Sequence, residues 1–98
     1  MCGIVGAVSG KEIKEKLFHG LMNLEYRGYD SVGMCLISNK KLNMKKGVGK
    51  LQEVHDKINF MTLKGSTGIA HSRWATHGGV TEKNAHPHVD CKNKISVV

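Results

Sequence analysis

The second residue of the chain, Cys2, has the chemistry of a nucleophile. Methionine aminopeptidases remove Met1 before a small residue, so Cys2 would become the first residue and carry a free α-amino group. The reference pKa is about 7.7–8.0 for such an amine and about 8.5 for a thiol. The amine could therefore take the proton of the thiol, directly or through a water, which makes one residue both attacker and base.

Position alone does not separate this hypothesis from an ordinary cysteine near a terminus. An apolar run follows at once, over residues 3–8. Termini are usually frayed unless they are tied into a sheet. The run therefore predicts that this terminus is part of the core, with Gly3 leaving room beside the sulfur.

A second chemical segment runs from Arg73 to Gly78 and follows a predicted strand. Arg73 could hold a carboxylate with two parallel hydrogen bonds, and Thr76 could donate a hydroxyl hydrogen to the same group. Trp74 offers a flat wall or a gate. These groups suit an amino-acid substrate. A surface arginine, a core tryptophan and a capped turn remain the open alternative.

A third pattern is a crowd of metal-ligand residue types between residues 71 and 91, namely His71, His77, His86, His88 and Cys91. Structural zinc sites usually show ligands paired at close, repeated spacing, and the chain has no Cys-x-x-Cys. A non-catalytic zinc module is the weaker interpretation, and hydrogen-bonded loop histidines are a simpler one. We expect neither a metal nor another cofactor.

The segment 26–31 is a polar, aromatic turn between a helix and a strand. In one interpretation it is a helix end at which Gly28 takes a positive φ. In the other, Arg27 and Asp30 order the site around the N-terminus. The sequence alone leaves both open.

Several elements must position these residues. The run 3–8 predicts a buried strand, and Ser9 with Glu12 fits a capping box for the helix that follows. That helix carries one apolar face, formed by Ile13, Leu17, Leu21 and Leu24. A buried strand over 31–37 and an alternating strand over 42–48 predict a hairpin around a turn at 38–41.

The second half of the chain is less regular. Helical spacing predicts a short helix over 51–58, and residues 67–71 predict a further strand. No period runs through 72–94, and a loop of that length is more often functional or disordered than neutral. Residues 95–98 look like a strand cut off in progress, so we expect the chain to be truncated.

Composition limits the classes of protein to which the chain can belong. The chain has 98 residues, 40% of them hydrophobic, and a formal charge of +7, which fits a small globular unit. A basic balance can indicate a nucleic-acid partner, but the lysines are scattered and lack neighbouring aromatics for base stacking. We therefore expect no nucleic acid and keep a nucleic-acid module only as an alternative. No run is long enough to span a bilayer, and three distant cysteines without a signal peptide predict a cytoplasmic protein.

Four segments of the chain resemble the class II glutamine amidotransferases, which are N-terminal nucleophile hydrolases. The opening Met1–Gly6 is similar to the start of that class. The segments Leu24–Ser31, Ala70–Gly78 and Asn84–His88 are similar to the branch that passes ammonia to fructose 6-phosphate and makes glucosamine 6-phosphate. The likeness covers nearly the whole chain.

The resemblance implies an α+β fold, the αββα sandwich of N-terminal nucleophile hydrolases, with only its N-terminal portion present in residues 1–98. It implies that Cys2 attacks the side-chain amide of L-glutamine through a thioester. It further implies that Arg73, Thr76 and His77 hold the glutamine at its α-carboxylate end and that Trp74 helps to close the site.

The same resemblance implies partners and parts outside this chain. Fructose 6-phosphate would bind to a sugar isomerase domain that these residues lack, in a parent enzyme expected to be a homo-oligomer. An Asn-Gly pair just after Val98 would supply the oxyanion hole. The loss of one hydrogen-bond donor of such a hole typically lowers the rate on the order of a hundredfold to a thousandfold. We therefore expect these 98 residues alone to be inactive, and an incomplete gene product without activity is a further alternative.

Overall fold

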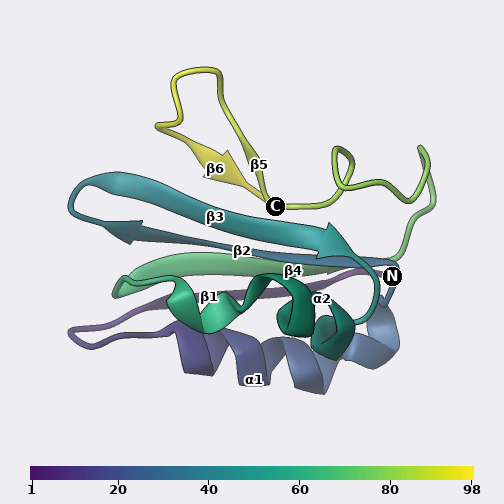
Figure 1. Cartoon of the computed structure of the whole chain (residues 1–98), viewed down its shortest axis with the longest axis horizontal. Helices are drawn as coiled ribbons and strands as arrows, with labels where there is room; N and C mark the ends of the chain where they lie inside the picture. The colour runs from purple at the N-terminus through teal and green to yellow at the C-terminus, as the bar shows by residue number, and fades with distance from the viewer.

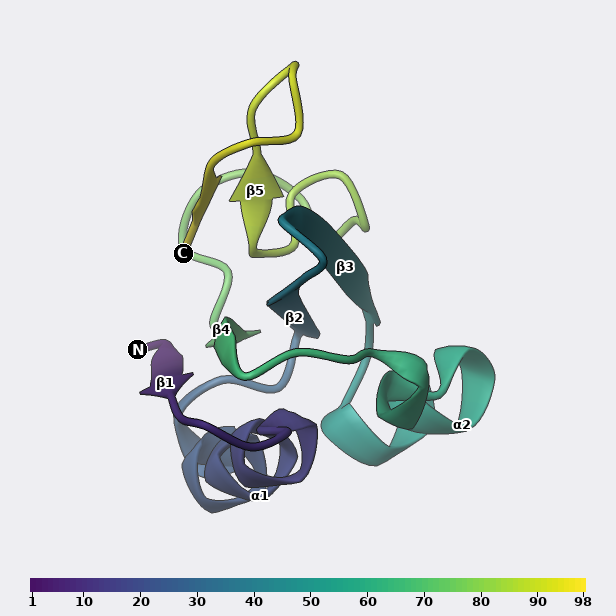
Figure 2. The ribbon, with the colours of Figure 1, turned by 90° about the vertical axis from the view of Figure 1, so that its left-hand side faces the viewer.

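A four-stranded antiparallel sheet forms the middle layer of the molecule, in a computed structural model that describes residues 1–98. Its strands are β1 (Gly3–Val8), β2 (Ser31–Ser38), β3 (Lys41–Val48) and β4 (Thr67–Arg73), in the order β1-β4-β2-β3. Helices α1 (Lys14–Leu24) and α2 (Leu51–Ile58) cover one face, and β5 (His88–Val89) with β6 (Ser96–Val97) lies over the other (Figures 1 and 2). The predicted α+β class is confirmed.

The core lies between the sheet and the helices. Side chains alternate along β2, so Val32, Met34 and Leu36 join one apolar cluster. Leu17 and Leu21 of α1 complete this cluster together with Ile13, the N-cap of α1. The alternate residues of β2, such as Ser31 and Cys35, are also buried, beneath the segment that carries β5 and β6. A strand covered on both faces has a continuous apolar sequence, which explains why residues 31–37 predicted a buried strand.

The predicted hairpin is confirmed. Residues Asn39 and Lys40 connect β2 to β3 with φ angles of 52° and 62°, the left-handed conformation that two-residue hairpin turns require. The register pairs Ile37 with Leu42 and Cys35 with Met44. The apolar side chains of β3 therefore lie on the sheet face opposite the helices.

The predicted capping box is wrong. Helix α1 begins at Lys14 with Ile13 as its N-cap and no side-chain hydrogen bond there. Ser9 Oγ accepts instead from the N–H of Lys11 at 3.2 Å, and Glu12 Oε2 accepts from the N–H of Gly65 at 2.7 Å. Glu12 thus ties the approach to α1 to the approach to β4 rather than closing the helix.

Strand β1 is in its predicted place but only half buried. Val5 and Ala7 pack against the core cluster, whereas Ile4 is 56% and Val8 is 82% exposed. The cause is topological, because β1 is an edge strand and its second face has no covering layer in these residues.

The irregular segment after β4 folds back over the sheet and ends in the β5–β6 hairpin. Asp90 organises that hairpin by accepting from the N–H groups of Lys94 at 2.6 Å and Ile95 at 2.8 Å. These backbone hydrogen bonds lower the pKa of the Asp90 carboxyl. Residues 96–97 pair with β5, as the predicted terminal strand requires. Neither helix is long and apolar enough to cross a membrane.

Candidate functional site

The sheet register brings the N-terminus to the segment that follows β4. Strands β1 and β4 pair antiparallel with Gly3 opposite Ser72, so Cys2 lies beside the end of β4 at Arg73 and Trp74. Figure 1 shows the N-terminus at this end of the sheet, next to the loop that leaves β4. Two segments about 70 residues apart in sequence therefore meet because of one strand pairing.

The thiol of Cys2 contacts the backbone of Trp74. The N–H of Trp74 donates to Cys2 Sγ at 3.4 Å, and the Cys2 thiol donates to the carbonyl of Trp74 over 3.8 Å. Cys2 is exposed, as a group that must meet a substrate has to be. These two contacts hold the sulfur against the backbone at the end of β4.

A cavity of about 460 Å³ opens beside this thiol. It is lined by residues of the N-terminus, the loop after β4 and the segment before β5, namely Cys2, Arg73, Trp74, Thr76, His77, Gly78, Asn84, His86 and His88. All five of the residues predicted to act in catalysis or binding line this one cavity. The structure brings them together, and their individual roles stay predictions.

Arg73 organises the loop that follows it. Its Nη1 donates to the carbonyl of Gly79 at 2.9 Å and its Nη2 donates to the carbonyl of His77. Asn84 Nδ2 donates to the same Gly79 carbonyl at 3.0 Å. Arg73 is only 6% exposed, and its guanidinium closes residues 73–79 into a compact loop. Three of the five N–H donors of the guanidinium are not used by these two carbonyls.

The turn 26–31 supports the loop, as the second of the two interpretations predicted for Asp30. Asp30 Oδ2 accepts from the N–H of Ala75 at 2.8 Å, and the ring of Tyr29 packs edge-on against Trp74 with centroids 5.8 Å apart. Arg27 reaches Met1, donating to its sulfur over 3.8 Å.

The expected positive φ at Gly28 is wrong, because Gly28 has an extended backbone with φ −165°. Glycine is needed there for another reason. A Cβ at this position would lie 2.7 Å from the carbonyl carbon of Arg73 and 2.8 Å from the carbonyl oxygen of Ser72.

Three histidine rings pack against one another, and two of them, His86 and His88, line the cavity. The ring centroids of His71 and His86 are 4.4 Å apart, and those of His86 and His88 are 4.5 Å apart. Burial lowers the pKa of His71 to about 4, assisted by the positive charges of His86, Arg73 and His88. Burial also lowers the pKa of His86. The buried imidazole of His71 is therefore neutral at pH 7.

The histidine stack does not have the geometry of a metal site. No group of three or more His, Cys, Asp or Glu side chains in the chain is arranged to hold a metal ion. Cys91, the other ligand of the zinc interpretation, is exposed in the β5–β6 hairpin. The zinc interpretation therefore gains no support from the structure.

Sequence reasoning from residue types assigned no substrate role to Asn84, His86 and His88, which line the cavity. They come from the aperiodic segment 72–94, and only the tertiary path of that segment places them next to Cys2. The resemblance of Asn84–His88 to one branch of the amidotransferases was the only signal that connected them with glutamine chemistry, since residue types had pointed to His86 and His88 only as possible metal ligands.

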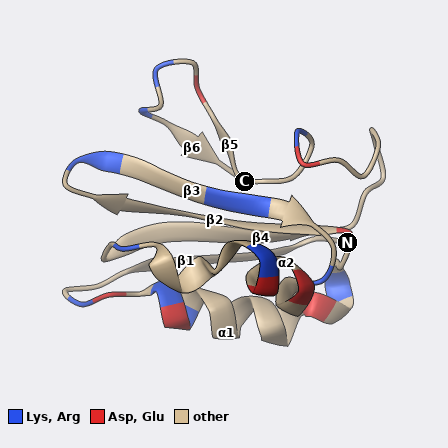
Figure 3. Ribbon diagram, viewed as in Figure 1, with Lys and Arg blue, Asp and Glu red and all other residues tan.

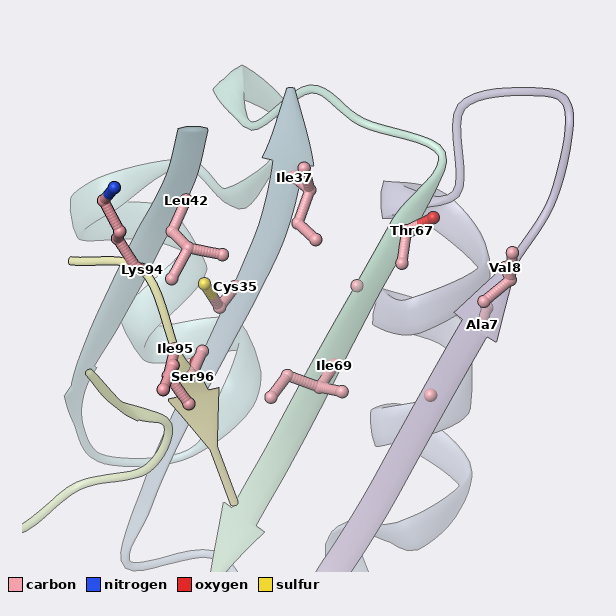
Figure 4. A pocket seen from close by; sticks show the side chains of 12 residues that line it. Ala7, Val8, Cys35, Ile37, Leu42, Thr67, Ile69, Lys94, Ile95 and Ser96 are labelled. Atoms are coloured by element: carbon pink, nitrogen blue, oxygen red, sulfur yellow. The ribbon is translucent and has the colours of Figure 1, made fainter. Parts of the chain in front are cut away.

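A larger cavity, of about 570 Å³, lies away from this chemistry. It is a mainly apolar groove between the open sheet face and β6, shown in Figure 4, with Ile37, Leu42, Ile69 and Ile95 among its lining residues. Its sulfur belongs to Cys35, whose pKa is raised by burial, so this thiol is a poor nucleophile. The groove is a packing surface rather than a reaction site.

Basic residues do not gather on one face. Figure 3 shows Lys and Arg along β3, and at the helices and in the loops it shows them together with Asp and Glu. A nucleic-acid groove would need a continuous basic stripe with aromatic side chains beside it for base stacking, and the structure does not combine these two features.

Comparison with known proteins shows which proteins this chain is similar to. No family model matches the chain. The isomerising glutamine–fructose-6-phosphate aminotransferase of Pyrococcus horikoshii is 49% identical over 98 residues, and that of Shewanella oneidensis is 53% identical over 98 residues. Both alignments cover 100% of this chain but 16% of the relative, so the chain spans about a sixth of the length of these curated relatives.

Solved structures give the same answer for the fold. Glutamine phosphoribosylpyrophosphate amidotransferase from B. subtilis, complexed with ADP and GMP, superposes with a TM-score of 0.79 at 30% identity, over 89% of this chain and 18% of that one. An allosteric regulatory enzyme of purine biosynthesis superposes with a TM-score of 0.79 at 32% identity, over 90% of this chain and 19% of that one. The chain therefore has the N-terminal nucleophile fold of the glutamine amidotransferases, and over its whole length it matches the N-terminal glutamine amidotransferase portion of the isomerising glutamine–fructose-6-phosphate aminotransferases.

Proposed function

We propose that this chain forms the glutamine-hydrolysing part of an aminotransferase, with Cys2 as the nucleophile. The observation that carries the proposal is the position of the Cys2 thiol, hydrogen-bonded to the N–H of Trp74 at the edge of the cavity that Arg73, Thr76 and His77 line. The sulfur would attack the side-chain amide carbon of glutamine, and ammonia would leave with the amide nitrogen. Water would then cleave the thioester and release glutamate.

Activation of the thiol requires that Met1 be removed. Met1 is 74% exposed, and its side chain makes only the long contact of its sulfur with Arg27. Such an end is open to an aminopeptidase. Removal would free the α-amine of Cys2, whose reference pKa of about 8 suits it to take up the thiol proton and return it to the leaving amide nitrogen.

Recognition of the amino-acid end of glutamine would come from the loop after β4. Arg73 is locked in place by the carbonyls that its guanidinium binds, so its remaining donors are preorganised for a carboxylate. Thr76 and His77 are exposed along the same loop and can add donors. Trp74, partly exposed and braced by Tyr29, would cover the bound side chain.

The second half of the reaction would take place outside these residues. The relatives are named for an aminotransferase reaction between glutamine and fructose 6-phosphate. We infer that ammonia released at Cys2 passes to a sugar-phosphate site and yields glucosamine 6-phosphate. None of the 98 residues is assigned to that site.

Covalent labelling tests the proposal. In the full-length protein that carries this chain, an electrophilic glutamine analogue such as a diazoketone should modify Cys2, and glutamine should protect it. The Cys2→Ala variant should take up no label and lose glutaminase activity. The Cys91→Ala variant is the matched control, since Cys91 is also an exposed thiol but lies outside the cavity, and this variant should label as wild type does. Full labelling of Cys2→Ala would refute the proposal.

A further inference from the structure

The segment 84–88, here called the wall segment, forms the side of the cavity contributed by Asn84, His86 and His88. It belongs to no helix, and only its last residue starts the two-residue strand β5. Its own backbone fixes only its start, where the N–H groups of Asn84 and Ala85 donate to the carbonyl of Thr81 at 3.2 Å and 3.1 Å. Something else must hold it against the sheet if its side chains are to keep one position beside the thiol.

Lys46 on β3 is the group that holds it. The Lys46 ammonium donates to the carbonyl of Ala85 at 2.7 Å and to the carbonyl of Pro87 at 3.1 Å. These two carbonyls flank His86 on either side. An ammonium that binds both fixes the path of the backbone through His86, and two of its three donors are used for this purpose.

The surroundings of Lys46 show a built contact rather than a chance one. The side chain is half-buried, and Ala85 and Pro87 are fully buried beneath it. Burial lowers the pKa of the Lys46 ammonium, and the nearby Glu82 carboxylate opposes that shift. A charge that is partly withdrawn from water is stabilised by hydrogen-bond partners, and the two carbonyls supply them.

Gly33 on β2 provides the seat for the same segment. A Cβ at Gly33 would meet the carbonyl oxygen of His86 and would lie 2.9 Å from Cδ of Pro87. The wall segment therefore lies directly on the backbone of β2 and is clamped from β3, the neighbouring strand. Both anchors come from strands of the central sheet, which are paired with each other along their whole length.

We propose that Lys46 is a positioning residue of the glutamine pocket, holding Asn84, His86 and His88 in place as the wall beside Cys2. This inference rests on the proposed function, because it assigns Lys46 a role in binding glutamine. Lys46 does not line the cavity and acts only through the wall segment. Its loss should therefore weaken binding of the substrate without changing the chemistry of the thiol.

The chain supplies a matched control on the same strand. Lys45 also donates through Nζ to a single backbone carbonyl, that of Ile58 at 2.6 Å, at the end of α2. Because successive residues of a strand point to opposite faces, Lys45 serves the helix layer and Lys46 the wall segment. Replacing either one removes one charge from β3 and at least one hydrogen bond to a carbonyl.

The test measures the inactivation of the full-length protein by the diazoketone glutamine analogue 6-diazo-5-oxonorleucine as a function of its concentration. In Lys46→Met, the concentration for half-maximal inactivation should rise about tenfold to a hundredfold, the range expected when a pocket is displaced by about 1 Å. The reaction of Cys2 with iodoacetamide, which needs no wall, should keep its rate. Lys46→Arg, which can bind both carbonyls, should recover most of the affinity, and Lys45→Met should match wild type.

The outcomes separate this inference from the proposed function. If wild type is not labelled at Cys2, the proposed function fails. If wild type is labelled but Lys46→Met has an unchanged half-maximal concentration, or Lys45→Met shows the same rise, the role of Lys46 is refuted and the function stands. Should Lys46→Met fail to fold, Lys46→Gln, which is too short to bind both carbonyls, takes its place under the same criteria.

Discussion

Single residues at the site act mainly through backbone groups. The sulfur of Cys2 is held by the N–H of Trp74, and Asp30 fixes the N–H of Ala75. Arg73 binds carbonyls of its own loop. The chemistry proposed for the thiol therefore depends on the path of the chain from 73 to 79, which three separate side chains define.

The buried imidazole of His71 predicts a pH dependence of stability. Its pKa is lowered to about 4 in the folded protein from 6.5, so the unfolded chain binds more protons between these two values. Stability should be unaffected by this group above pH 6.5 and should fall as the pH drops toward 4. The slope should reach about 1.4 kcal/mol per pH unit, and the loss should approach about 3 kcal/mol.

Urea unfolding between pH 4 and pH 7.5 measures this slope. The His71→Leu variant should flatten the part of the curve that His71 causes, whatever its stability at pH 7.5. The exposed His19 supplies the control, since His19→Gln should leave the slope as in wild type. A wild-type slope that His71→Leu does not change would contradict the assignment of a buried, neutral imidazole.

At the scale of elements, the site depends on the close approach of the turn after α1 to the end of β4. The N–H of Asp30 donates to the carbonyl of Arg73 at 3.0 Å, and Gly28 lies against the backbone of Ser72 and Arg73. Any side chain at 28 would push these two segments apart. The turn and the strand end can therefore share one position only if residue 28 is glycine.

Substitution of Gly28 tests this packing. Gly28→Ala should lower the free energy of unfolding by about 1–3 kcal/mol, the usual cost of forcing a methyl group into a filled space. It should also slow the labelling of Cys2, because the loop at Arg73 moves. Gly10→Ala is the control, with no atom within 4 Å of its new Cβ, and it should be neutral. Equal unfolding free energies for both variants would contradict the close approach.

Local patterns in the sequence predicted most helices and strands, because the spacing of apolar residues in each element reflects which of its faces is buried. The alternation of 42–48, the helical spacing of Ile13, Leu17 and Leu21, and the apolar run of β2 all follow directly from the layers they face. The capping box failed because Glu12 finds a better donor in Gly65, which is 53 residues away. A tertiary hydrogen bond of that kind leaves no trace in local sequence.

The candidate site, like the fold, could be predicted only where the signal lies within a short segment of sequence. Cys2 and the residues from Arg73 to His77 lie in two short segments whose residue types suggest their chemistry. The wall segment and its anchor Lys46 become visible only after β3 and residues 84–88 are placed together. Residue types alone grouped the same histidines into a metal hypothesis, because they report possible ligands and not the distances between them.

At the scale of the whole molecule, the helix side of the sheet is closed and the other side is partly open. The open side exposes apolar side chains along β1, β2 and β6, with Ile4, Val8, Ile37, Ile95 and Val97 all more than 40% exposed. Together with the groove in Figure 4, they form an apolar surface of the kind that drives association.

The 98-residue chain should therefore self-associate when it is produced alone. Ile37→Lys places a charge on the open side and should shift the chain toward the monomer, with a change in unfolding free energy of about 0.5 kcal/mol or less. The neighbouring Leu36 points into the helix layer, so Leu36→Lys should prevent folding. Size-exclusion chromatography with light scattering over a concentration series decides the question, and a wild-type chain that stays monomeric throughout would contradict the account.

The central claim is that one residue supplies both the sulfur and the base. The direct measurement compares glutamine hydrolysis by full-length protein that has lost Met1 with the same protein kept in its Met1-bearing form by an aminopeptidase inhibitor, each verified by intact mass. The mature form should be about 10²–10⁴-fold faster, the range of general base catalysis, and should form a glutamyl thioester on Cys2. Equal rates for the two forms would show that the free amine of Cys2 takes no part.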